Sequence, residues 1–187
     1  LMGLKIYTSM LNLSKGFADS IKKVLHGISA ENICGIVFCG TSDTIEYHQL
    51  LNNLKSAVSD ALGRRVPVTL IPQYLLPEGG LSIEIYTLED VSATIRIEER
   101  GGVCYGLIES AEESMLFVEG IPASDFSESV HKQSREVFDK LDSLLTSYGF
   151  AVDDIVRQWN YIGNIVSYRN GKQNYQEFND ARTNYYA

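Results

Sequence analysis

Hydrophobic and polar positions follow one of two periods along nearly the whole chain. Period-two alternation or a short apolar run predicts a strand, and apolar residues three or four positions apart predict a helix. Glycine, proline and acidic residues separate these segments. The pattern predicts strands over residues 4–10, 33–39, 66–72, 81–86, 93–98, 103–109 and 115–121. It predicts helices over residues 14–27, 47–62 and 127–148.

The last part of the chain combines both periods. Residues 155–163 alternate and predict a strand, residues 175–186 have helical spacing, and the loop between them contains Asn170 and Gly171. A helix face against a closed core should be apolar. Here one face mixes an amide and a guanidinium with aromatic rings, at Tyr175, Asn179, Arg182 and Tyr186. This stripe predicts a ligand cleft between the helix and the preceding strand.

Two stretches of the chain repeat one another. ENICGIVFCG precedes a helix that begins at Tyr47, and DDIVRQWNYI precedes a helix that begins at Tyr175. In both copies a helix, an acidic step, a strand, a loop and a second helix follow in order. The repeat predicts two related half-units, residues 1–90 and 91–187. Together they predict an α+β fold with a mixed β-sheet and helices packed on one face.

The repeat also gives the sharpest functional indication. Aligned on the two tyrosines, Asn179 and Arg182 replace Leu51 and Leu54 of the first copy. A buried arginine needs an anion to offset its desolvation, and its planar fork matches a carboxylate. The second copy therefore predicts a binding site for a small carboxylated substrate.

Two alternatives remain open at these residues. Arg182 can instead pair at the surface with Asp180, Glu177 or a neighbouring carboxylate. The preceding strand also carries a set of residues that share one face, which is either part of the binding site or an aromatic core: Arg157, Trp159 and Tyr161.

Composition narrows the class of protein. The chain has 187 residues, 44% of them hydrophobic, which is ample for a packed core. Its net charge is −8 without a long Lys/Arg cluster, which argues against nucleic acid as a partner. No apolar run reaches the roughly 18 residues of a membrane span, and no signal peptide is recognisable, so we expect a cytoplasmic protein away from membranes.

Scattered histidines predict no metal site, and we expect no cofactor. Three cysteines in apolar surroundings predict buried free thiols, namely Cys34, Cys39 and Cys104.

Several of these features resemble the RidA (YjgF) superfamily. In order, they are FVEGIPA at 117–123, a helix followed by Tyr148 and Gly149, the DDIV step, and the run from tyrosine to Phe-Asn. QWNYIGNIV with NYQEFNDAR is further similar to the chorismatase branch, whose members cleave the enolpyruvyl group from chorismate. That branch pairs a degenerate RidA-like N-terminal half with a catalytic RidA-like half, which matches the two copies found here.

The resemblance implies a chorismatase-like hydrolase that removes pyruvate from chorismate or a related enolpyruvyl cyclohexadiene carboxylate. It implies a homo-oligomer, with a trimer as the expected assembly. Two other functions remain open, an enamine/imine deaminase of the RidA type and a non-catalytic binding or assembly module. The residues expected to hold the substrate are Arg182, Asn179, Tyr175, Tyr161 and Arg157.

The chain departs from the superfamily pattern in its catalytic residues. The superfamily follows the second helix with two strands, which carry a carboxylate-binding arginine and a glutamate. In the first copy Val68 and Thr69 occupy the arginine region, although Glu84 matches the glutamate. In the second copy both residues would lie beyond Ala187. The resemblance therefore implies either a second half truncated before its last two strands or an incomplete site, and the catalytic residues stay unknown. It also implies a sheet edge that another chain could pair with.

Overall fold

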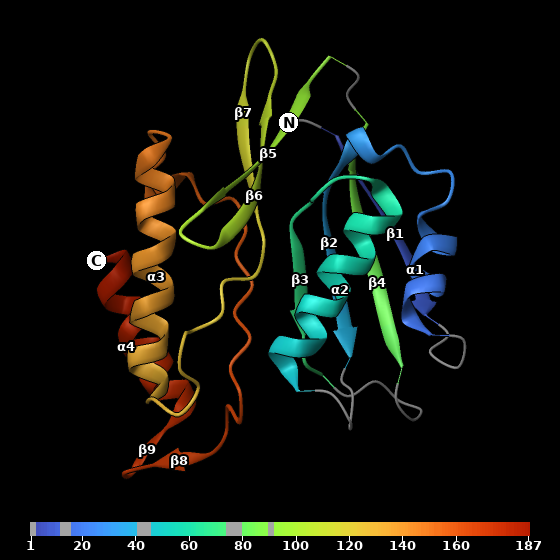
Figure 1. Ribbon diagram of the computed structural model, residues 1–187. Helices are drawn as coiled ribbons and strands as arrows, with labels where there is room; N and C mark the ends of the chain where they lie inside the picture. The colour runs from blue at the N-terminus through green and yellow to red at the C-terminus, as the bar shows by residue number, and fades with distance from the viewer. Residues whose placement is uncertain (1–2, 12–15, 41–45, 74–79, 90–91) are drawn as a thin grey trace. The chain divides into compact units, whose positions relative to one another are not determined.

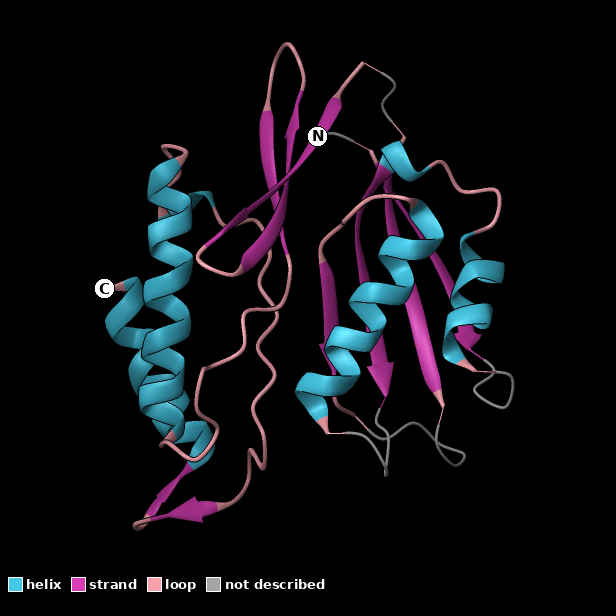
Figure 2. Cartoon of the chain, in the orientation of Figure 1, coloured by secondary structure: helices cyan, strands magenta, loops and turns pink. Residues whose placement is uncertain are grey.

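The computed structural model describes residues 3–11, 16–40, 46–73, 80–89 and 92–187 (Figure 1). The chain divides into two compact units, Leu1–Gly120 and Ile121–Ala187. The boundary predicted at residues 90 and 91 lies outside the described residues. Helices and strands are both abundant (Figure 2), which confirms the α+β class at this coarse level.

A four-stranded mixed sheet forms the centre of the N-terminal unit. Its strand order is β1-β4-β2-β3, in which only β2 and β3 run parallel. The helices α1 and α2 cover one face of this sheet (Figure 1), and a short 3-10 helix, η2, precedes β2. The elements are β1 (Leu4–Leu11), α1 (Phe17–Leu25), η2 (Ala30–Asn32), β2 (Ile33–Gly40), α2 (Tyr47–Leu62), β3 (Val68–Ile71) and β4 (Leu81–Leu88).

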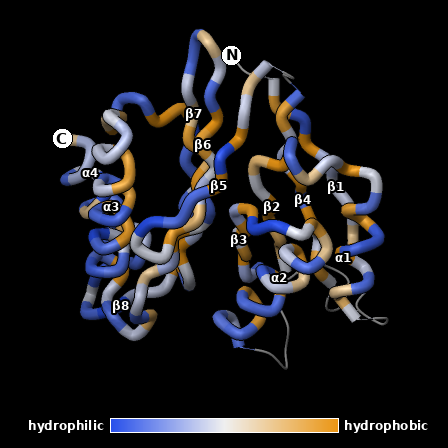
Figure 3. The backbone as a smooth tube through the Cα atoms, turned by 45° about the horizontal axis from the view of Figure 1, so that its top comes forward, coloured by the Kyte–Doolittle hydropathy of each residue, from blue (hydrophilic) through white to orange (hydrophobic). Residues whose placement is uncertain are grey.

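The sequence explains why these elements form and pack. Alternate residues of β4 are buried against the helices. The apolar residues of α2 lie at helical spacing on one face, and this face packs against them. The Glu46 carboxylate caps α2 by accepting from the backbone N–H groups of His48 (3.1 Å) and Gln49 (3.3 Å). The core between helices and sheet includes Ile21, Phe38, Leu54, Val58, Ile83 and Ile85. Apolar residues run along β2, β3 and β4 in Figure 3.

A second, antiparallel sheet packs on the other face of the first sheet within the same unit. Its order is β5-β6-β7. A tight turn joins β5 to β6, and both of its residues, Gly101 (φ 58°) and Gly102 (φ 79°), need the positive φ that glycine allows. The Tyr86 and Phe117 rings lie 5.2 Å apart, centroid to centroid, where the two sheets meet. The strands are β5 (Thr94–Arg100), β6 (Val103–Glu109) and β7 (Ser114–Val118).

All three cysteines lie in the N-terminal unit as free thiols. Cys34 and Cys104 are buried, which confirms the prediction for these two, whereas Cys39 is half-buried. Burial raises the pKa of the Cys34 thiol to about 12 and that of Cys104 to about 11. The pKa of Cys39 is also raised, by burial and then by the charge of Glu84.

Two helices, α3 and α4, pack against each other in the C-terminal unit. They pack through Phe138, Phe178 and Ala181, and the Tyr185 ring stacks on Phe138 with their centroids 4.6 Å apart. No helix among the described residues is long and apolar enough to cross a bilayer. The elements are α3 (Val130–Ser147), the 3-10 helix η3 (Val152–Asp154), β8 (Tyr168–Arg169), β9 (Lys172–Gln173) and α4 (Asn174–Tyr186).

The strand predicted over residues 155–163 is wrong. The half-buried residues of this segment lie three and four positions apart, at Ile155, Gln158 and Ile162, and the residues between them are exposed. No described strand forms a ladder with the segment. Alternating residue types predict an extended backbone, but a strand also needs a hydrogen-bonding neighbour, which the local sequence does not specify.

A charged cluster beside α3 gives the C-terminal unit a pH-dependent stability. Glu136 accepts hydrogen bonds from Lys140 Nζ (2.6 Å) and from the Ser124 backbone N–H and hydroxyl. These contacts lower the pKa of Glu136 from 4.5 to about 2, and the hydrogen bond from Lys140 has the largest effect. A carboxyl with a depressed folded-state pKa stabilises the fold above its unfolded pKa, and loses this effect as pH falls.

We therefore expect Glu136→Gln to remove part of the stability that the wild type loses between about pH 4.5 and pH 2. The cluster is about one-third exposed, so the expected effect at neutral pH is only about 0.5 kcal/mol. Urea unfolding at a series of pH values measures it. Asp139→Asn is a control on the same helix, because Asp139 is exposed and forms no ion pair with a described residue. Identical pH dependence in Glu136→Gln and the wild type would contradict the assignment.

Candidate functional site

The helix α4 is held in place by contacts on several sides. The Gln176 side chain accepts from the Gln173 backbone N–H (3.2 Å) and caps its N-terminus. Asp180 forms an ion pair with Lys172 of the preceding hairpin. Glu177 accepts from the His131 backbone N–H at the start of α3 (3.3 Å). These contacts fix the rotation of α4, and therefore fix which side chains it presents beside its buried face.

A pocket of about 570 Å³ lies between the C-terminal end of α4 and residues 158–160. Along one wall, the Tyr186 hydroxyl donates to Gln158 Oε1 (2.6 Å), and Gln158 Nε2 donates to Asn160 Oδ1 (2.7 Å). These two hydrogen bonds occupy the side-chain oxygen of Asn160 and leave its NH₂ group as a donor. The six residues that line the pocket are Gln158, Asn160, Arg182, Thr183, Tyr186 and Ala187.

Arg182 is the one charged side chain among these six residues, and it is exposed, so the buried arginine expected from the repeat is wrong. Its guanidinium lies over the Phe178 ring, 5.6 Å from the centroid. In the part of the chain that the structure describes, no carboxylate lies within ion-pair distance of it. The alternative expectation, pairing with Asp180 or Glu177, is therefore wrong, because both carboxylates are engaged elsewhere. The side chains that line the pocket offer one exposed cation and neutral donors and include no carboxylate, which suits a carboxylate ligand.

The other predicted site residues lie outside the lining of this pocket. Tyr175 and Tyr161 are exposed, and Arg157 lies over the Trp159 ring, 5.1 Å from its centroid. The Asn179 side-chain oxygen is buried without a hydrogen-bond partner among the described residues. The pocket thus brings together Arg182 and Tyr186 of the predicted stripe, and does not include the rest.

Sequence reasoning missed Gln158, Asn160 and Thr183. The signal for the first two was present, because they alternate with Arg157, Trp159 and Tyr161. We assigned the site to the aromatic set, whereas Gln158 and Asn160 line the pocket beside α4. Alternation separates the two faces of an extended segment but does not say which of them meets the helix.

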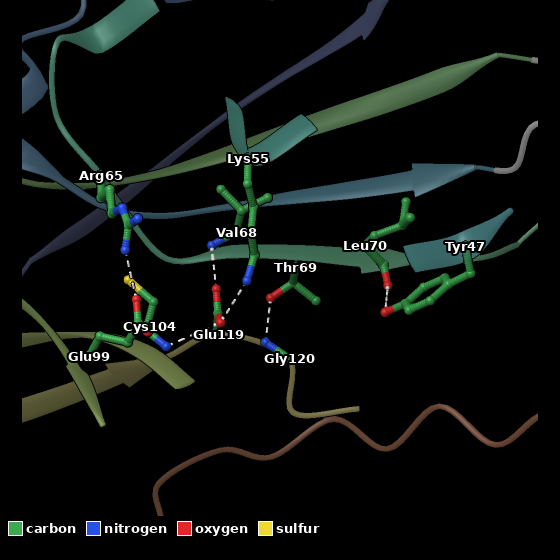
Figure 4. Close-up of polar contacts among 10 residues, drawn as sticks. All are labelled: Tyr47, Lys55, Arg65, Val68, Thr69, Leu70, Glu99, Cys104, Glu119 and Gly120. Atoms are coloured by element: carbon green, nitrogen blue, oxygen red, sulfur yellow. Dashed lines mark hydrogen bonds and ion pairs between the residues drawn. The ribbon is translucent and has the colours of Figure 1, made fainter. Parts of the chain in front are cut away.

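A second polar cluster lies in the N-terminal unit (Figure 4). The Glu119 carboxylate is buried and accepts from Lys55 Nζ (2.8 Å) and from the backbone N–H groups of Val68 (3.2 Å) and Cys104 (3.1 Å). Next to it, Thr69 Oγ1 accepts from the Gly120 N–H (2.7 Å). Three donors occupy the carboxylate, so this cluster ties α2, β3 and β6 together.

No group of three His, Cys, Asp or Glu side chains that could hold a metal ion occurs within the described ranges. The pocket at Arg182 is a candidate ligand site in the described chain. A search of known protein families and of curated proteins finds no match to this chain.

Proposed function

We propose that the pocket at Arg182 binds a small ring compound that carries a carboxylate. The observation that carries this proposal is the guanidinium without an ion-pair partner among the described residues, in a pocket that no carboxylate side chain lines. A carboxylate would form a charge-assisted pair with Arg182 and accept from the Asn160 NH₂ and the Thr183 hydroxyl. A volume of about 570 Å³ lies within the range of small-molecule sites.

The proposed activity is a chorismatase-like hydrolysis, and it rests on the resemblance of QWNYIGNIV and NYQEFNDAR to that branch. A proton adds to the methylene carbon of the enol ether, and water adds to the adjacent carbon. The resulting hemiketal then collapses to pyruvate and a dihydroxycyclohexadiene carboxylate. The role of the pocket in this reaction is to hold the ring carboxylate, so that the enol ether keeps one orientation.

A second candidate function, a non-catalytic binding module, is favoured by the chemistry of the lining. None of the six lining residues is a carboxylic acid or a histidine. Protonation of the enol ether needs such a general acid, so the pocket alone accounts for binding and not for turnover.

The test is chorismate binding by calorimetry together with pyruvate release. We expect Arg182→Ala to weaken binding by at least about tenfold, because it removes a charge-assisted hydrogen bond. Arg182→Lys should fall in between, since it keeps the charge but loses the planar fork. Arg135→Ala is the matched control, because Arg135 is an exposed arginine on α3 outside the pocket.

Each outcome separates the candidates. Pyruvate release that falls in Arg182→Ala supports the hydrolase. Arg182-dependent binding without pyruvate release supports the binding module. If Arg182→Ala bound chorismate and simpler ring carboxylates as tightly as Arg135→Ala, the site assignment would be incorrect.

A further inference from the structure

Three residues that line the pocket form one chain of hydrogen bonds, which we call the relay. The Tyr186 hydroxyl donates to Gln158 Oε1 (2.6 Å), and Gln158 Nε2 donates to Asn160 Oδ1 (2.7 Å). An amide side chain accepts at one end and donates at the other, so the relay has a direction. It begins at the tyrosine hydroxyl and ends at the NH₂ group of Asn160.

The two ends of the relay are held differently. The Tyr186 ring makes edge-to-face contacts with Phe138 (ring centroids 6.5 Å apart) and with Tyr185 (5.1 Å), and Phe138 belongs to the core between α3 and α4. These contacts hold the Tyr186 oxygen in place. Asn160 is exposed, and among the described residues its side chain has one hydrogen bond, that from Gln158. The orientation of the Asn160 amide is therefore set by Gln158.

The direction of the relay decides what the pocket offers to a ligand. In the observed direction Asn160 offers a donor, in the same pocket as the Arg182 guanidinium. With its amide reversed, Asn160 would offer an oxygen, which would repel a carboxylate and compete with it for the guanidinium. An Asn160 without the relay could adopt both orientations. The relay therefore favours a ligand group that accepts hydrogen bonds at two points.

We infer that Gln158 and Tyr186 are positioning residues that make the pocket select a ring carboxylate over the carboxamide of the same ring. They act through Asn160. A carboxylate has one oxygen for Arg182 and a second for Asn160, whereas the NH₂ group of a carboxamide would face a donor at one of these two residues. The inference rests on the proposed function, because it needs a ligand at Arg182, and it applies equally to the hydrolase and to the binding module.

Binding of benzoate and of benzamide at neutral pH tests this inference. Titrations followed by the amide chemical shifts of the protein give both dissociation constants, and their ratio is the readout. Gln158→Leu removes the relay without adding a charge. We expect it to weaken benzoate binding about fivefold, the value of one neutral hydrogen bond. Benzamide should bind as before or more tightly, because Asn160 can then turn its oxygen toward the ligand NH₂ group. A merely structural defect would weaken both ligands.

A double-mutant cycle tests whether Tyr186 acts through Gln158. Tyr186→Phe should lower the selectivity for benzoate in the wild-type background and have no further effect on it in the Gln158→Leu background. Two controls should keep the wild-type selectivity. Tyr168→Phe makes the same change at a tyrosine that is 70% exposed and lies outside the pocket lining. Asn184→Ala removes an exposed amide of α4 that also lies outside the lining.

Failure of the site and failure of the relay give different results. If benzoate did not bind the wild type, or bound Arg182→Ala as tightly, the proposed site would be wrong and the relay with it. If Arg182→Ala weakened benzoate binding but Gln158→Leu kept the wild-type selectivity, the relay alone would be overturned. If Tyr186→Phe lowered the selectivity equally in both backgrounds, Tyr186 would contact the ligand directly and would not be a positioning residue.

Discussion

Glu119→Ala is expected to lower the free energy of unfolding of the N-terminal unit by about 3 kcal/mol. The substitution leaves the backbone N–H groups of Val68 and Cys104 without their acceptor in a buried place, and removes the partner of Lys55. Chemical denaturation followed by far-ultraviolet circular dichroism measures the loss. Tryptophan fluorescence is unsuitable, because the single tryptophan, Trp159, lies in the C-terminal unit.

Glu99→Ala provides the matched control for this prediction. It also removes a glutamate that pairs with a cation at 2.8 Å, but both Glu99 and Arg65 are largely exposed. Exposed pairs contribute about 0 to 1 kcal/mol. Similar losses in the two variants would show that burial and the two backbone donors contribute nothing at Glu119.

Gly40→Ala is expected to destabilise the same unit by about 2 to 4 kcal/mol. Gly40 ends β2 with φ 146°, a conformation that residues with a Cβ rarely adopt. A Cβ there would lie 2.3 Å from the carbonyl oxygen of Gly80 and 2.8 Å from Leu81 Cδ2. Since the nearest atom belongs to the backbone at the start of β4, a side-chain rotation cannot relieve the contact. The shift must come from the ladder between β2 and β4.

The control for Gly40 is Gly63→Ala. Gly63 ends α2 with φ 69°, and nothing lies within 4 Å of its added Cβ. Gly63→Ala therefore costs only the free energy of placing an alanine at positive φ, which we expect to be about 1 kcal/mol. The difference between the two variants therefore reports the steric contact with Gly80 together with the greater backbone strain at φ 146°. If both lost the same free energy in denaturant unfolding, the contact would have no energetic consequence.

Local pattern predicts most elements of this chain because their signals are local. The alternation of Leu81, Ile83 and Ile85 gives β4, and the glycine pair at 101–102 gives the turn between β5 and β6. The apolar spacing of Leu50, Leu54 and Val58 gives α2.

The features that the sequence could not predict depend on distant partners. Glu119 is visible as a carboxylate in an apolar run, but its partners Lys55 and Val68 lie 64 and 51 residues away. Arg182 was predicted because a guanidinium on a helix stripe is a local anomaly. The position of Asn160 in the pocket lining was not predicted, because it depends on which side of residues 155–163 meets α4. The absence of a ladder for residues 155–163 among the described strands has the same origin.

The burial of Cys34 and Cys104 has a consequence for the chemical lifetime of the protein. A thiol reacts with oxidants and alkylating agents as its thiolate. With pKa values of about 12 and about 11, these two groups are almost entirely protonated at neutral pH. Cys34 is also shielded by the packing of the two sheets, and Cys104 is only 9% exposed. Covalent damage at either thiol must therefore wait until the unit opens, so resistance to oxidation is set by the frequency of that opening and not by the intrinsic reactivity of cysteine.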